Sequence, residues 1–305
     1  MPHQQTRSFL MRRFEEAGIS PQTRHGQNFL IDLNLLRLLH RTAAVGPQDV
    51  VLEVGTGTGG LTALLAADAA HVVTVEIDAR LFQLASEELA GVRNVTMLHI
   101  DALRNKNHLH PEVLEAVKEQ LAADPGRRFK LAANLPYNIA TPIISNALAL
   151  EVPPRTITVT IQKELADRIL AAPSTKDYGS LTVWVQSQCR ATLVRVMPPD
   201  VFWPRPKVSS AIVHLELDDA LRGAIPDLEF FHRFVREMFF HRRKFLRGVA
   251  VSAFKNELSK SEVDEVLASQ QLGPTARTEE LSVERLLALC EAFRGKLAVA
   301  RASSP

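Results

Sequence analysis

The sequence predicts a doubly wound α/β fold: a mostly parallel sheet that ends in an antiparallel hairpin and is followed by a small all-helical domain. Two observations predict the parallel sheet. Short β-branched, apolar segments recur from residue 48 onward, and helix-like segments separate them. Continuous apolar strands that alternate with helices are typical of a parallel sheet covered on both faces. The third observation is that strand patterning stops after Asp219, where apolar residues begin to recur at helical spacing.

Five parallel strands are expected, at Val50–Val54, Val72–Ile77, Val95–Ile100, Phe129–Ala133 and Thr156–Ile161. Helices are expected between them at Gly60–Ala67, Ala79–Leu89 and Pro142–Leu150. The connection from Asp101 to Asn134 is long, and we predict a surface helix over Pro111–Ala123 with flexible flanks.

Two further strands, Thr192–Met197 and Val208–Leu217, follow the parallel set, and only a proline-rich loop joins them. This loop is too short for a crossover helix, so the two strands must pair antiparallel. The sequence therefore predicts a cofactor domain over residues 1–219, with an N-terminal helical segment over 1–47. A helical domain is predicted over residues 220–305.

Composition excludes several classes of protein. The chain has 305 residues, of which 46% are hydrophobic, and no apolar stretch reaches the roughly 18 residues of a membrane helix. No apolar segment follows the N-terminal arginines, so no signal peptide is predicted and we expect a cytoplasmic protein. Cys189 and Cys290 stand alone in apolar stretches, which predicts buried thiols and neither a disulfide framework nor a metal site.

Charge is distributed unevenly between the two expected domains. Residues 1–219 carry 22 basic and 23 acidic side chains, whereas residues 220–305 carry 14 and 11. Within residues 232–256 there are seven basic side chains and one acidic side chain, Glu237. Such a stripe is one signature of a polyanionic partner, and a solvated helix face is the alternative.

A glycine-rich turn follows the first expected strand, in the segment Glu53-Val-Gly55-Thr-Gly57-Thr-Gly59-Gly60. Glycines allow the backbone to approach a ligand closely and to adopt unusual dihedral angles. Glu76 ends the second strand, where a carboxylate can accept hydrogen bonds from both ribose hydroxyls of an adenosine. Asp101 follows the third strand, where it can meet an adenine amino group.

Two cofactors fit this pattern. Gly55, Gly57 and Gly60 satisfy the dinucleotide fingerprint, so a nicotinamide oxidoreductase is one hypothesis. Glu53, two residues before the glycines, favours S-adenosylmethionine. The hairpin at the end of the sheet also departs from the dehydrogenase plan.

The fourth strand leads into Asn134-Leu135-Pro136-Tyr137, whose residue types suit methyl transfer to an exocyclic amine. The lone pair of an adenine amino group is delocalised into the ring. Acceptors at its two protons, the Asn134 side-chain oxygen and the Leu135 carbonyl, would localise that lone pair. Pro136 fixes the backbone and Tyr137 offers a stacking face. Catalysis would then depend on positioning and electrostatics, with no strong base.

With these motifs the sequence resembles the small-subunit ribosomal RNA adenine dimethyltransferase family (KsgA/RsmA type), over most of the chain. The resemblance implies a Rossmann-like, class I S-adenosylmethionine-dependent methyltransferase. It implies dimethylation at N6 of two adjacent adenines in a loop near the 3′ end of small-subunit rRNA. Further matching segments are residues 25–30, 162–164, 178–181, 198–210, 241–247 and 277–282.

The resemblance also implies roles for single residues. Asn28 and Leu30 would cover the cofactor, Gly55 would approach its methionine part, and Gly57 would be a further cofactor-binding residue. Glu76 would bind the ribose, Asp101 the adenine, and Asn134 both cofactor and substrate. Phe202 would be a second aromatic against the target base, and without the resemblance we would favour a hydrophobic plug beside Trp203. The RNA-binding residues would be Arg242, Arg243, Lys244 and Arg247.

Two departures from the family pattern stand out: Thr56 and Thr58, where relatives often have proline and a bulkier apolar residue, and the long segment 101–134. The expected partner is small-subunit rRNA or the immature small ribosomal subunit, with no membrane, and the expected state is monomeric. Large-subunit rRNA methyltransferases of the antibiotic-resistance type share these motifs and form the alternative. A non-enzymatic RNA-binding protein that kept the fold is a further alternative.

Overall fold

The computed structural model describes residues 7–16, 18, 27–241 and 244–302. Contacts divide the chain into two compact units: Met1–Ala166 with Ala191–Leu217, and Asp167–Arg190 with Asp218–Pro305. From the sequence, residues 167–190 are expected in the first domain. The structure groups them with the helical unit because helix α8 (Ser180–Gln186) packs on α10 (Leu228–Met238), where Trp184 contacts Phe231.

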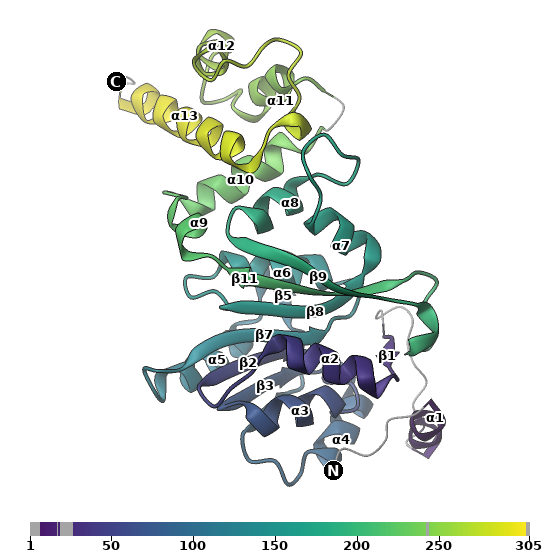
Figure 1. Cartoon of the computed structure of the whole chain (residues 1–305). Helices are drawn as coiled ribbons and strands as arrows, with labels where there is room; N and C mark the ends of the chain where they lie inside the picture. The colour runs from purple at the N-terminus through teal and green to yellow at the C-terminus, as the bar shows by residue number, and fades with distance from the viewer. Residues whose placement is uncertain (1–6, 17, 19–26, 242–243, 303–305) are drawn as a thin grey trace. The chain divides into compact units, whose positions relative to one another are not determined.

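The first unit is built on a seven-stranded sheet of order β4-β3-β2-β7-β8-β11-β9 (Figure 1). Its strands are β2 (Asp49–Val54), β3 (His71–Val75), β4 (Val95–Leu98), β7 (Arg128–Asn134), β8 (Thr156–Gln162), β9 (Cys189–Met197) and β11 (Ser210–Leu217). The first five strands along the chain are parallel. β11 runs antiparallel to β8 and separates it from β9. The five predicted parallel strands and the reversal at the end of the sheet are confirmed.

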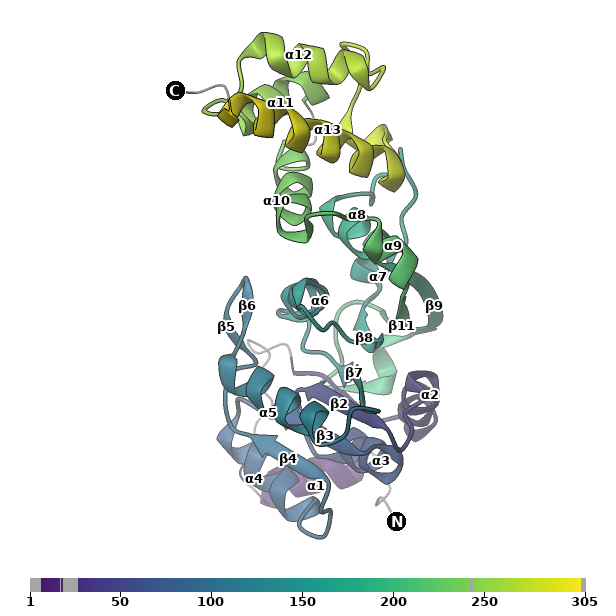
Figure 2. The ribbon, with the colours of Figure 1, turned by 90° about the vertical axis from the view of Figure 1, so that its left-hand side faces the viewer.

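Helices cover both faces of this sheet, as the apolar strands predict. Figure 2 shows α2 (Leu33–Ala43) and α3 (Gly60–Asp68) on one side. The other side carries α5 (Pro111–Ala122) and α6 (Ala140–Ala149). α4 (Ala79–Glu88) lies beside the start of α3, where Ala85 approaches Gly59. All six residues of β2 are buried. Removing such apolar surface from water is the main stabilising contribution to the fold.

Side-chain caps fix where the helices of this unit begin. Asp32 precedes α2 and accepts from the backbone N–H groups of Asn34 and Leu35 at 2.8 and 3.2 Å. Asp78 caps α4 in the same way. A cap of this kind is worth about 1 kcal/mol. Because Asp78 comes two residues after Glu76, the cap also fixes the chain where β3 ends.

Two small sheets complete the first unit. β1 (Phe29–Leu30) pairs antiparallel with β10 (Phe202–Trp203). β5 (Leu103–Asn105) pairs antiparallel with β6 (His108–Leu109), and α5 follows directly. The predicted helix in the 101–134 segment is confirmed, but the expectation of a flexible flank before it is wrong. Asn105 closes a tight turn there, its side chain accepting from Asn107 N at 2.9 Å.

The remaining elements are α1 (Arg7–Glu16), α7 (Lys163–Ile169), η2 (Pro199–Val201), α9 (Asp219–Gly223), α11 (Leu246–Ala253), α12 (Lys260–Ser269), η3 (Thr278–Glu280) and α13 (Val283–Ala302). The helical unit has its own aromatic core, in which Phe254 stacks on Phe293 with ring centroids 4.6 Å apart. No helix of the described residues is long and apolar enough to cross a membrane.

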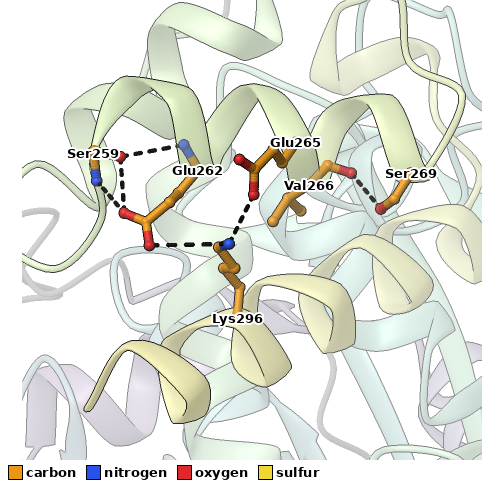
Figure 3. Close-up of polar contacts among 6 residues, drawn as sticks. All are labelled: Ser259, Glu262, Glu265, Val266, Ser269 and Lys296. Carbon is orange, nitrogen blue, oxygen red and sulfur yellow. Dashed lines mark hydrogen bonds and ion pairs between the residues drawn. The ribbon is translucent and has the colours of Figure 1, made fainter. Parts of the chain in front are cut away.

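Polar contacts join α12 to α13 at the surface of the helical unit (Figure 3). Ser259 and Glu262 form a capping box at the start of α12. Lys296 of α13 lies 2.8 Å from Glu265 and 3.9 Å from Glu262. This network uses one of the unit's basic side chains internally, so Lys296 contributes little free positive charge.

Candidate active site

A cavity of about 160 Å³ lies where the parallel strands end. The strand order reverses between β2 and β7, and ligands of open α/β sheets bind outside the carboxyl ends of the strands at such a point. All seven residues that the sequence analysis assigned to the cofactor line this cavity: Asn28, Leu30, Gly55, Gly57, Glu76, Asp101 and Asn134. The fold therefore brings together positions from five segments of the chain.

Two glycines of the turn, Gly55 and Gly57, line the cavity in backbone conformations that favour glycine. Gly55 has φ +86°, and a Cβ there would lie 3.3 Å from Cδ of Pro136. Gly57 has φ +57°, and a Cβ there would lie 3.3 Å from the Phe29 ring. Side chains at these two positions would be strained and would displace the cavity walls. The turn is thus shaped to leave backbone exposed to a ligand.

Glu76 is buried where β3 ends and is held on both oxygens. Oε2 accepts from the backbone N–H of Gly57 and Oε1 from that of Asp78, each at 3.0 Å. Burial raises the pKa of Glu76, and these two backbone hydrogen bonds act in the opposite direction. Each carboxylate oxygen keeps a further lone pair, so the group can also accept from two ligand hydroxyls.

Glu53 forms the base of the cavity and is 1% exposed. Its Oε2 accepts from the hydroxyls of Thr62 at 2.6 Å and Thr74 at 2.8 Å. Burial raises the pKa of Glu53 to about 8, although these hydrogen bonds oppose the shift. Thr56 is hydrogen bonded to Thr74 at 2.7 Å, so one of the two departures from the family pattern joins this network.

Asp101 lies at the opposite wall and is exposed. One of its oxygens, Oδ1, accepts from Leu103 N at 2.9 Å, which fixes the carboxylate at the start of the β5–β6 hairpin. Its other oxygen can accept a hydrogen bond from a ligand amine. The structure is consistent with the predicted place of Asp101, and its contact with adenine stays a prediction.

Asn134 ends β7, and a hydrogen bond to the segment before α2 orients its side chain. Its Nδ2 donates to the backbone carbonyl of Asn28 at 2.9 Å. Because the amide nitrogen is used in this way, Oδ1 is the atom that can accept from a substrate amine. The next residue, Leu135, donates from its backbone N–H to Thr160 O at 3.2 Å. These two bonds hold the backbone and the side chain of the motif in place.

Leu135 and Pro136 also line the cavity, and Tyr137 is the one residue of the motif that does not. Pro136 contacts Gly55, and its carbonyl accepts from Ile139 N at 3.2 Å, which forms a tight turn. Tyr137 is half-buried and does not line the cofactor cavity. Its hydroxyl is hydrogen bonded to Ser210 Oγ at 2.5 Å. A ring held outside the cofactor cavity but on the same loop is suited to a second ligand.

Phe202 is not where a stacking role requires it. The side chain is 2% exposed and packs in a hydrophobic cluster that includes Leu30, Leu36 and Met197. Pairing of β10 with β1 places Phe202 opposite Leu30. The predicted contact with a target base is absent from this conformation because the ring fills the core beneath the loop. The structure supports the alternative of a hydrophobic plug.

Several cavity residues were missed by the sequence analysis. Ile77 and Ala102 each follow one of the acidic side chains already identified and line the cavity. Ile77 is 47% exposed, which is unusual for a large apolar side chain next to a buried carboxylate. Only their positions in the sequence could have identified them, because each directly follows a predicted ligand-binding acid at the end of a strand.

Part of the predicted basic stripe lies outside the described residues, namely Arg242 and Arg243. Lys244 is exposed. Arg247 is also exposed, but it forms a two-pronged ion pair with Asp264 at 2.6 and 2.8 Å. Asp264 compensates the charge of Arg247, so Arg247 is a weaker candidate for an RNA contact than the sequence suggested.

Comparison with known proteins agrees with this geometry. Residues 19–294 match the family model of ribosomal RNA adenine dimethylases. The chain is 40% identical over 269 residues to "Ribosomal RNA small subunit methyltransferase A" of Caldanaerobacter subterraneus subsp. tengcongensis, covering 88% of this chain and 95% of that protein. A protein of the same name from Lactiplantibacillus plantarum is 40% identical over 278 residues, covering 90% and 91%.

Solved structures give a similar result. A dimethyladenosine transferase from Plasmodium falciparum superposes with a TM-score of 0.70 at 25% identity, covering 87% of this chain and 97% of that one. The 23S rRNA methyltransferase ErmE superposes with a TM-score of 0.60 at 27% identity, covering 87% and 99%. With a family model that spans most of its length and relatives of this similarity, the chain belongs to the ribosomal RNA adenine dimethylase family.

Proposed function

We propose that this chain transfers methyl groups from S-adenosylmethionine to N6 of two adjacent adenines in a loop near the 3′ end of small-subunit rRNA, giving N6,N6-dimethyladenosine. One observation carries the proposal: Asn134 is fixed beside the glycine turn with its side-chain oxygen left to accept from an amine. The substrate is the immature small ribosomal subunit or its rRNA, and the enzyme acts as a monomer.

The cavity residues fit S-adenosylmethionine. Backbone is exposed at Gly55 and Gly57 for the methionine part, and Glu76 has free lone pairs for the ribose hydroxyls. Asp101 lies at the wall for the adenine amine, and Asn28 and Leu30 cover the group. When bound, S-adenosylmethionine supplies an electrophilic methyl group on a sulfonium.

The protein's own contribution is to bind and orient the target amine. Asn134 Oδ1 and the Leu135 carbonyl accept from the two N6 protons, which localises the nitrogen lone pair. Tyr137 supports the base by stacking, and the N6 proton is lost to solvent because the methylated amine is acidic. A base must leave its stack to reach such a site, so a loop target is favoured over a regular duplex.

A large-subunit substrate is the alternative, since the 23S rRNA methyltransferase ErmE shares the fold at 27% identity. The more similar relatives carry the small-subunit name, which favours the small subunit. A nicotinamide cofactor is disfavoured because no group in the Asn134 motif serves hydride transfer.

The test uses labelled S-adenosylmethionine with two substrates: small-subunit particles that lack the modification, and protein-free large-subunit RNA. We expect label in the particles, and mapping should place dimethyladenosine at two adjacent adenines. Label in the large-subunit RNA alone would overturn the choice of substrate. Calorimetric titration with S-adenosylhomocysteine and with NAD checks the cofactor, and we expect binding of the first only.

A further inference from the structure

The hydroxyl of Ser210 lies 2.5 Å from the hydroxyl of Tyr137, although 73 residues separate them in the chain. Ser210 is fully buried at the first position of β11. Tyr137 belongs to the loop after β7 that carries Asn134. The hydrogen bond therefore joins a loop to the start of a strand, and it sets the direction of the tyrosine ring.

β8 connects the two residues and lies between β7 and β11 in the sheet (Figure 1). On one side Thr160 of β8 is opposite Asn134, and on the other Gln162 is opposite Ser210. The backbone just before Ser210 is also fixed, because Lys163 N, directly after β8, donates to Ser209 O at 2.9 Å. Ser210 therefore shares one rigid frame with Asn134.

We propose that Ser210 is a positioning residue for methyl transfer: its hydroxyl holds the Tyr137 ring so that the target adenine stacks with its amine at Asn134. This inference rests on the proposed function. Ser210 itself touches neither cofactor nor base, since it does not line the cofactor cavity and its side chain is covered. A hydrogen bond to its hydroxyl restricts a tyrosine ring to fewer orientations than a phenylalanine ring has at the same site.

The variants Ser210→Ala, Tyr137→Phe and the double variant form a cycle that tests this contact. Tyr137→Phe keeps the stacking face and removes only the hydroxyl. We expect each single variant to lower kcat about tenfold with an unchanged KM for S-adenosylmethionine, since orientation and not cofactor binding is lost. The double variant should be no worse than either single variant. Ser209→Ala is the matched control and should keep the wild-type rate.

A second readout does not depend on activity. The chain has two tyrosines, so fluorotyrosine labelling gives two fluorine NMR signals. The signal lost in Tyr137→Phe belongs to Tyr137, and it should shift in Ser210→Ala but not in Ser209→Ala. Tyr178, whose hydroxyl donates to Leu281 O at 2.8 Å, provides the reference signal.

The proposal would be overturned by additive losses in the double variant, by a wild-type rate in Ser210→Ala, or by an unmoved Tyr137 signal. A loss of rate that follows a lowered melting temperature would also overturn it, because the role would then be structural only. Failure of the proposed function looks different. In that case the wild-type chain itself would transfer no methyl group to the particles, while the fluorine signals would still report the contact.

Discussion

The side-chain amide of Asn134 donates a hydrogen bond to the backbone carbonyl of Asn28, with 2.9 Å between the two atoms. This bond joins the end of β7 to a segment more than 100 residues earlier in the sequence. It also fixes which end of the amide is available to a ligand. The covering segment and the proposed catalytic side chain are therefore coupled: displacing residue 28 frees the Asn134 amide to rotate.

Asn134→Ala should abolish most methyl transfer and leave the fold intact. Loss of one positioned acceptor for the developing charge costs about 100-fold in kcat. Initial rates with small-subunit particles measure the loss, and circular dichroism checks the fold. Asn107→Ala, an exposed asparagine in the β5–β6 turn, is the control. Folded Asn134→Ala protein with the wild-type rate would disprove the assigned role.

Glu76→Gln should weaken binding of S-adenosylhomocysteine by about tenfold or more, because a charged acceptor forms stronger hydrogen bonds than an amide. The NH₂ group of the glutamine would also face a backbone N–H, either that of Gly57 or that of Asp78, and it cannot accept a hydrogen bond from it. Calorimetry measures the change in Kd. Glu88→Gln, on the exposed side of α4, should bind normally. Equal affinities in all three proteins would exclude Glu76 from the ribose contact.

The raised pKa of Glu53 predicts that the protein without bound cofactor loses stability as the pH rises. Its pKa is about 8 when folded against an ordinary value of 4.5, so the folded state binds the extra proton. The contribution of Glu53 to the free energy of unfolding is fully present below pH 4.5, and it is lost progressively as the pH rises to about 8. Each pKa unit corresponds to about 1.4 kcal/mol. Glu53→Gln should remove this loss.

Urea unfolding of wild type and Glu53→Gln at several pH values between 5 and 8.5 tests the prediction. The free energies of unfolding should diverge toward high pH in favour of the variant. Glu88→Gln controls for the change of net charge, and its pH dependence should follow that of the wild type. Parallel curves for wild type and Glu53→Gln would show that Glu53 ionises normally.

Phe202→Ala should destabilise the protein by about 3–5 kcal/mol, the usual cost of emptying a buried phenylalanine site. Phe202→Leu should restore most of that stability and keep methyl transfer near the wild-type rate, because the plug needs volume but no aromatic face. Unfolding free energies and initial rates are the measurements. A stable Phe202→Leu protein with a large loss of rate would instead support the stacking role predicted from the sequence.

Replacing Arg242, Arg243 and Lys244 together by alanine should weaken rRNA binding and flatten its dependence on salt. Each lost phosphate contact lowers the slope of log K against log salt by about 0.7–0.9. Arg247→Ala should change the slope less, since Asp264 already compensates that charge. Loss of this exposed ion pair should change the stability of the protein little. An unchanged slope in the triple variant would favour a solvated helix face.

Local patterns sufficed to predict the parallel strands, because an element buried on both faces must be apolar along its whole length. The centre of β2 therefore appears in the sequence as the apolar run Val50-Val51-Leu52, and β8 consists of β-branched residues from Thr156 to Ile161. The β5–β6 hairpin could not be predicted in this way. It is short, and its turn residue Asn105 is typical of loops as well as of hairpins.

The fold class and the cofactor residues could be predicted from the sequence, since glycines and acids at successive strand ends must meet at one edge of a parallel sheet. The long-range contacts could be seen only in the folded chain: Asn28 on Asn134, Ser210 on Tyr137, and Phe202 in the core. The physical reason is that a hydrogen bond or a buried ring between distant segments leaves no periodic trace in the chain. The direction of a side chain depends on neighbours that folding brings to it.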